Sequence, residues 1–172
     1  IDILEDKGYN PLVAKILSSR GLNTEDKIKE FFTLSLSQMH DPFLLPNIHN
    51  AVDRISYAIK NKEIIYIWGD YDVDGITSTA LMVRALRKFG GCIKYHVPNR
   101  QKDGYDIKPE SIEKIVKSDA KLIITVDCGI VAFAAAEKAK ELGIDLIITD
   151  HHTPMATGEI PDCLAVINPK II

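Results

Sequence analysis

The sequence is poor in cysteine, and its cysteines show no regular spacing. Only Cys92, Cys128 and Cys163 occur among 172 residues, and no two of them form a CxxC arrangement. An odd, irregular set of this kind excludes the disulfide framework of small secreted domains and is typical of a reducing compartment. We therefore expect a cytoplasmic protein.

Long apolar runs, an export signal and an excess of basic residues are missing as well. The apolar runs are far shorter than the ~20 residues that a membrane-spanning helix needs, and no charged segment followed by an apolar one opens the chain. The net charge of −3 excludes a basic field over the whole surface. An anionic substrate stays possible, since two bound divalent cations would more than offset this charge. We expect no membrane partner.

The composition is that of a globular protein with a real core, at 46% hydrophobic and 26% charged residues. Residues 1–60 show helical apolar spacing without strand-like runs, and they predict a small helical N-terminal segment. From residue 61 to 172, apolar runs alternate with helical patterns. The sequence therefore predicts two parts, 1–60 and 61–172.

The second part predicts an α/β fold. Continuous apolar runs such as 122–124 and 146–148 are typical of parallel strands buried on both faces. Alternation of such strands with helices predicts a doubly wound, mostly parallel sheet flanked by helices. We expect strands near 63–69, 93–98, 121–126, 145–149 and, more weakly, 164–167, and helices near 75–89, 109–118 and 131–142.

Acidic and histidine side chains follow three of the predicted strands. Asp70, Asp72 and Asp74 alternate after the first strand, so their side chains share one side of an extended backbone. Three such charges repel one another unless a cation lies between them, and oxygen-rich clusters suit Mg²⁺ or Mn²⁺. Asp127 ends the third strand, and His151 follows the fourth. Ligands of open α/β sheets bind at these carboxyl ends, so the sequence predicts one shared site.

Carboxylates that bridge two hard cations, completed by imidazole, predict a two-metal site for phosphate chemistry. We assign Asp72 and Asp74 as metal ligands, Asp70 as a third, Asp127 as the bridge and His151 as the imidazole ligand. The predicted catalytic set consists of Asp72, Asp74, Asp127, His151 and His152.

The remaining polar groups predict contacts to a phosphodiester substrate. His152 points away from His151 along an extended chain, so we expect it to face a phosphate or to support the metal ligands from behind, with Asp150 orienting a histidine. After the second predicted strand, Arg100 can donate two hydrogen bonds to a phosphate, and Tyr105 can stack on a base. Each signal also has a structural reading: an N-cap at Asp127, a solvated edge for the three aspartates, and a solvated loop around Arg100. Cys128 is interpreted as packed, since no dedicated base accompanies it.

At these residues the chain resembles the DHH phosphoesterase superfamily, and within it the RecJ-type single-strand-specific DNA exonucleases. The resemblance implies a Mn²⁺- or Mg²⁺-dependent phosphodiesterase, with Asp72, Asp74, Asp127 and His151 on the metals and His152 near the scissile phosphate. Other branches carry a histidine at the place of Trp68. The matching words are Gly69-Asp70-Tyr71-Asp72-Val73-Asp74-Gly75, Pro98-Asn99-Arg100, Val126-Asp127-Cys128-Gly129-Ile130, Asp150-His151-His152 and Ile167-Asn168-Pro169-Lys170.

The chain departs from the RecJ-type pattern in three ways. Asp106 stands where such chains often carry the second glycine of a Gly-Tyr-Gly word. The resemblance also implies a further metal-binding aspartate and a substrate-binding domain beyond the residues present. We therefore expect an N-terminal fragment whose DHH-type domain is incomplete at its C-terminal end and which is weak or inactive alone.

The leading hypothesis is the catalytic core of a two-metal 5′→3′ exonuclease for single-stranded DNA, acting in DNA repair and recombination. A single-strand-binding protein or a helicase would be reached through the missing domains. The alternatives are a phosphoesterase for oligoribonucleotides, pyrophosphate or cyclic dinucleotides, and a non-catalytic nucleic-acid-binding module.

Overall fold

The computed structural model describes residues 8–101, 104 and 106–171. Contacts within the chain divide it into two units, Ile1–Asp41 and Pro42–Ile172. Among the described residues, no helix combines the length and apolarity that a membrane crossing requires.

The first unit is helical and small. It contains helices α2 (Pro11–Ser19) and α3 (Glu25–Phe32) and the short 3-10 helix η1 (Leu36–Gln38). Side-chain caps start both α-helices: Asn10 accepts a hydrogen bond from the Leu12 N–H at 3.0 Å, and Thr24 accepts one from Lys27. A core of Ala14, Leu17 and Ile28 joins the two helices. The predicted helical N-terminal segment is confirmed.

The second unit is an α/β sheet with all described strands parallel. The strand order is β2-β1-β3-β4-β5, so the chain winds outward in both directions from β1 and β3. This confirms the predicted doubly wound sheet. The elements in chain order are η2 (Pro42–Leu44), α4 (Ile48–Lys60), β1 (Ile64–Trp68), α5 (Val73–Lys88), β2 (Cys92–His96), α6 (Pro109–Val116), β3 (Ala120–Val126), α7 (Phe133–Glu141), β4 (Asp145–Thr149) and β5 (Ala165–Ile167).

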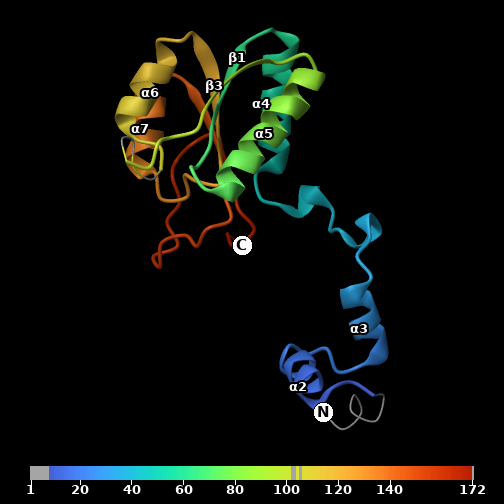
Figure 1. Ribbon diagram of the computed structural model, residues 1–172. Helices are drawn as coiled ribbons and strands as arrows, with labels where there is room; N and C mark the ends of the chain where they lie inside the picture. Colours follow the sequence, from blue (N-terminus) through green and yellow to red (C-terminus); the bar gives the residue numbers. More distant parts are fainter. Residues whose placement is uncertain (1–7, 102–103, 105, 172) are drawn as a thin grey trace. The chain divides into compact units, whose positions relative to one another are not determined.

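Helices cover both faces of the sheet, with α4 and α5 on one side and α6 and α7 on the other (Figure 1). The central strand β3 is enclosed by both layers, and Leu122, Ile123 and Ile124 have no exposed surface. Successive side chains of a strand point to opposite faces, so Leu122 and Ile124 join the core under α4 and α5, whereas Ile123 joins the core under α6 and α7. The uninterrupted apolar run of β3 thus follows from its two buried faces.

Helix α4 lies before the domain boundary that we predict at residue 60, yet it packs on the sheet. Its Ala51 and Ala58 belong to the same core cluster as Ile65 of β1. Its Arg54 donates to Asp145, the first residue of β4, at 2.6 Å. The contact-based division after Asp41 therefore differs from the predicted one, and the boundary near residue 60 stays a prediction.

Candidate metal centre

The turn between β1 and α5 carries the three aspartates of the first motif. Gly75, in the first turn of α5, packs so closely on the main chain of Asp70 that a Cβ atom there would overlap the Asp70 carbonyl. Asp70 is 3% exposed, and one of its carboxylate oxygens accepts the N–H of Tyr71 at 2.7 Å. The glycine therefore lets the start of the helix close over a buried carboxylate.

Asp72 is the N-cap of α5. Its Oδ1 accepts the N–H of Gly75 at 3.0 Å, and this bond is the main reason why the pKa of Asp72 lies below its usual value. The cap also explains why α5 begins at Val73 and not at residue 75 as expected. Asp74 lies in the first turn of the helix and is exposed to solvent.

Asp127 occupies the centre of the site. It follows β3 with a left-handed backbone (φ 63°), and its N–H continues the sheet by donating to the Thr149 carbonyl at 2.9 Å. Its Oδ1 lies 3.0 Å from Nε2 of His151, whereas Oδ2 is buried and has no hydrogen-bond partner among the described residues. Burial, and next the charge of Asp72, raises the pKa of Asp127. A cation at Oδ2 would offset both effects.

Asp150 organises the turn after β4. Its Oδ1 accepts the main-chain N–H groups of His151 (2.7 Å) and His152 (3.0 Å), and it lies 2.7 Å from Nδ1 of the His152 ring. Its Oδ2 accepts the N–H of Ile130, in the loop after β3, at 3.0 Å. The bond to Asp150 raises the pKa of His152. The predicted orienting role of Asp150 therefore has a geometric basis in the bond to His152.

Two groups of possible metal ligands meet at Asp127. Ligand atoms of Asp70, Asp72 and Asp127 lie within 4.8 Å of one another, and so do those of Asp127, His151 and His152. Hard oxygen donors with one or two imidazoles fit Mn²⁺ or Mg²⁺. The unpartnered buried oxygen of Asp127 supports this fit, since a buried carboxylate oxygen without a partner is costly. Asp74 joins neither group, and His152, expected to face a phosphate, lies close enough to serve as a ligand.

The predicted substrate residues lie partly outside the described residues. Arg100 is exposed, and its guanidinium lies 5.3 Å from the centre of the Tyr71 ring, between Asp70 and Asp72 in the sequence. The loop after β2 thus meets the first motif through a cation–π contact. Tyr105 lies outside the described residues.

Two residues near the site, Asp106 and Asn168, are not predicted from the sequence to be site residues. Asp106 is half-buried with a left-handed backbone (φ 69°), and burial, with the charges of Asp150 and Asp70, raises its pKa to about 6. Asn168 has no exposed surface and donates to the main-chain carbonyl of His152 at 2.9 Å. The Asn168-Pro169-Lys170 word could have drawn attention to Asn168, whereas nothing near Asp106 in sequence reveals its neighbours.

Trp68, the last residue of β1, is part of the core. It is 5% exposed, and its ring lies against that of His96 with centroids 4.7 Å apart. An apolar ring therefore fills the end of β1 beside the aspartates.

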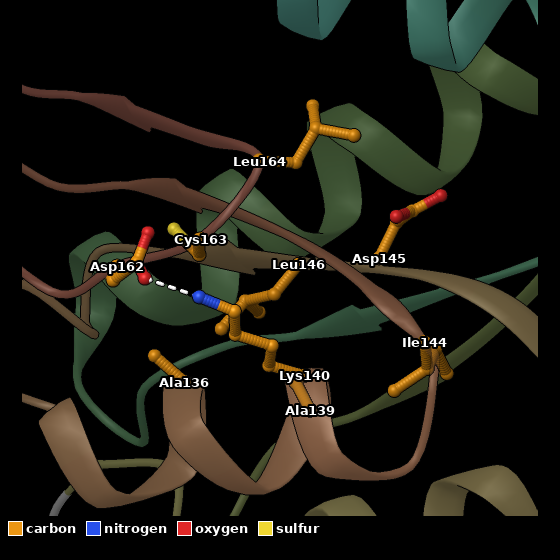
Figure 2. Close-up of a pocket in the computed structure, with 9 residues that line it drawn as sticks. All are labelled: Ala136, Ala139, Lys140, Ile144, Asp145, Leu146, Asp162, Cys163 and Leu164. Carbon is orange, nitrogen blue, oxygen red and sulfur yellow. Dashed lines mark hydrogen bonds and ion pairs between the residues drawn. The ribbon is translucent and has the colours of Figure 1, made fainter.

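A separate cavity of about 300 Å³ lies at the opposite end of β4 (Figure 2). Ile144 and Asp145 at the start of β4 line it, and an exposed ion pair of 2.6 Å between Lys140 and Asp162 crosses its rim. Cys163 borders the cavity, and burial raises the pKa of its thiol to about 11, so it is a poor nucleophile. The cavity lies at the amino end of β4, whereas the candidate metal centre lies at the carboxyl ends of the strands, where ligands of such sheets bind. The two are therefore distinct.

Comparison with known proteins agrees with this architecture. The family model described as "DHH family, N-terminal domain" matches residues 64–172. The chain belongs to the DHH family. It is 41% identical over 168 residues to the single-stranded-DNA-specific exonuclease RecJ of Bacillus subtilis, covering 98% of this chain and 21% of that protein. The RecJ of Escherichia coli is 39% identical over 162 residues, covering 94% of this chain and 27% of that protein.

Two solved structures have a similar fold. A crystal structure of exonuclease RecJ bound to manganese matches with a TM-score of 0.69 and 33% identity over 76% of this chain and 33% of that chain. RecJ of Thermus thermophilus in complex with Mn²⁺ matches with a TM-score of 0.67 and 28% identity over 89% of this chain and 20% of that chain. The predicted family resemblance is confirmed, and this chain spans only 21–27% of the two exonuclease sequences above.

Proposed function

We propose that this DHH-family chain is the catalytic core of a two-metal exonuclease that hydrolyses phosphodiester bonds of single-stranded DNA. The observation that carries the proposal is Asp127: it is shared by two ligand groups and keeps a buried carboxylate oxygen without a partner among the described residues. The similarity to RecJ proteins of two bacteria, both described as single-stranded-DNA-specific exonucleases, supports the choice of substrate.

In this proposal, Asp127 would be a ligand shared by two cations. Asp70 and Asp72 would hold one of them, and His151 would hold the other; Asp74, at the exposed start of α5, is proposed as an additional ligand. Mn²⁺ or Mg²⁺ at these positions would acidify a water molecule and neutralise charge that develops on the phosphate. An aspartate is ionised at neutral pH, and the lowered pKa of Asp72 keeps its carboxylate ionised in more acidic solution as well.

We assign the substrate contacts to His152 and Arg100, with Tyr105 as a stacking partner. The bond of Nδ1 to Asp150 directs the opposite edge of the His152 ring, with Nε2, away from Asp150, where it can donate to a phosphate oxygen. Arg100 lies over Tyr71 and can donate two parallel hydrogen bonds to the next phosphate. These donors would orient the scissile group relative to the metals.

The first prediction concerns Asp127 and His151 in the full-length protein. Asp127→Asn and His151→Ala should each lower Mn²⁺-dependent nucleotide release from single-stranded DNA by at least about 10²-fold, because each removes a metal ligand. Asp162→Asn is the matched control, since it changes an exposed aspartate at the other end of the sheet and should leave the rate unchanged. Wild-type rates in both site variants would refute the assignment.

The same assay separates the proposed substrate from its alternatives. Single-stranded DNA labelled at either end should lose its 5′-terminal nucleotide first, whereas duplex DNA, oligoribonucleotides, pyrophosphate and cyclic dinucleotides should react slowly or not at all. Faster turnover of one of the small substrates would replace the exonuclease proposal with a small-substrate phosphoesterase.

We place this activity in DNA repair and recombination in the cytoplasm, in line with three free cysteines and no disulfide among the described residues. Strand separation supplies single-stranded DNA, so a helicase or a single-strand-binding protein is the proposed partner. Stimulation of the full-length enzyme by such a protein on long single strands would support the partnership.

A further inference from the structure

Asn168 connects the end of β5 to the histidine turn. Its side-chain amide is bonded at both ends: Nδ2 donates to the main-chain carbonyl of His152 at 2.9 Å, and Oδ1 accepts the N–H of Lys170 at 2.8 Å. The residue has no exposed surface. Buried amides satisfied at both ends have a fixed orientation, so Asn168 is a rigid link between two segments.

His152 is therefore held at two points. Asp150 holds the ring through Nδ1 at 2.7 Å, and Asn168 holds the carbonyl of the same residue. The two anchors are themselves joined, because the Asp150 N–H donates to the carbonyl of Ile167 at 3.0 Å. The ring position thus depends on β5 as well as on β4.

We propose that Asn168 is a positioning residue of the metal centre: it fixes the main chain of His152 so that the ring stays beside Asp127 and His151. No regular secondary structure follows β4 until β5 begins at Ala165, so the segment around His152 has no strand or helix to hold it. Without the amide, the His152 carbonyl would lose its buried donor, and the turn would shift toward water to regain one. The kinetic part of this inference rests on the proposed exonuclease function, whereas the geometric part does not.

The test uses two variants of the full-length protein and one matched control. Asn168→Asp keeps the shape and the acceptor but loses the donor, and Asn168→Leu removes the amide without adding charge. Asn47→Asp is the control, because Asn47 also donates its Nδ2 to a main-chain carbonyl of β5, that of Val166 at 3.4 Å, and not to the carbonyl of His152. The readouts are the ring signals of His152 in protein with selectively labelled histidine, kcat and KM on single-stranded DNA, and the melting temperature.

We expect the His152 ring signals to move in both Asn168 variants and to stay in place in the control. The kcat should fall about 10- to 100-fold with KM changed less than about twofold, as is typical when a group that orients a functional side chain is lost. If Asn168→Asp does not fold, Asn168→Leu decides the matter.

Unmoved ring signals in the Asn168 variants would overturn the proposal, and so would equal losses of kcat in the control. Unfolding of both variants would also overturn it, since Asn168 would then be a stability residue only. If wild-type protein lacks metal-dependent hydrolysis, the proposed function fails, and the ring signals alone still decide the role of Asn168.

Discussion

Left-handed backbone conformations mark two residues at or near the metal centre, Asp106 and Asp127, with φ values of 69° and 63°. For a residue with a side chain this conformation costs about 1 kcal/mol or more, although aspartate tolerates it better than most. At Asp127 it turns the chain so that the N–H still bonds to Thr149 while the carboxylate reaches His151. The strained backbone of Asp127 thus places its carboxylate where the site needs it.

Asp106 should make the stability of the metal-free protein depend on pH. Its pKa is raised from 3.8 to about 6, so the folded state binds its proton more tightly than the unfolded state. The stabilisation that this gives is complete below the unfolded pKa and is lost as pH rises through the folded pKa. Relative to Asp106→Asn, the wild type should therefore lose up to about 3 kcal/mol of unfolding free energy between about pH 4 and pH 7.

Urea unfolding in the presence of a chelator measures this difference, with Asp119→Asn as the control. Asp119 is exposed and has the same left-handed conformation (φ 63°), so its variant corrects for the backbone effect of the exchange. A stability gap between wild type and Asp106→Asn that does not vary with pH would contradict the expectation.

At the scale of elements, the sequence pattern predicted the strands to within one or two residues, because β3 and β4 are buried on both faces and read as continuous apolar runs. The predicted start of α5 lies two residues too late, because the sequence pattern identifies Asp72 as a metal ligand and not also as the cap. A capping carboxylate and a ligand carboxylate look alike in sequence. Both roles suit the turn, as the cap uses Oδ1 for one hydrogen bond.

Arg54 should contribute strongly to the attachment of α4. Its guanidinium donates to Asp145 at 2.6 Å and to Glu63 at 2.7 Å, and its side chain is only 14% exposed. Arg54→Met leaves Glu63, 20% exposed, and Asp145, 46% exposed, without their partner, and because both are partly solvated the free energy of unfolding should fall by about 1–3 kcal/mol. Chemical denaturation of the two proteins measures the difference.

Lys140→Met is the matched control for Arg54. Lys140 pairs with Asp162 at the same distance of 2.6 Å, but their side chains are 72% and 83% exposed. Exposed pairs contribute less than about 1 kcal/mol, so this variant should be nearly as stable as the wild type. A loss in Arg54→Met as small as that expected for Lys140→Met would show that the attachment of α4 does not depend on Arg54.

At the scale of the whole molecule, the question is where the sheet unit begins. A protein that starts at Pro42 should fold cooperatively, because it keeps α4 with its core residues and Arg54. One that starts at residue 61, the predicted boundary, should be less stable by several kcal/mol or fail to fold, since the face of the sheet under α4 would be exposed. Circular dichroism melting of the two truncated proteins tests this.

Equal stability of the two truncated proteins would favour the boundary at residue 60. The composition of residues 48–60 resembles that of the preceding helices, so sequence patterns could not tell on which side of the boundary α4 belongs. In the structure, Arg54 contacts Asp145, 91 residues later, and so ties α4 to the sheet, while the boundary at residue 60 stays a prediction.

The sequence by itself determined the class of fold, the family and the acidic and histidine residues at the strand ends, because these follow from local patterns of apolar spacing and from short words. Only the tertiary structure decided which of these residues bring ligand atoms close enough together to contact one ion, and that Asp74 belongs to neither group of such ligands. It also decided that Asp106 and Asn168 lie close to the metal centre. Such distances depend on how loops after different strands close over one edge of the sheet. The forces that set this closure, burial and hydrogen bonds between residues far apart in the chain, leave no periodic trace in the sequence.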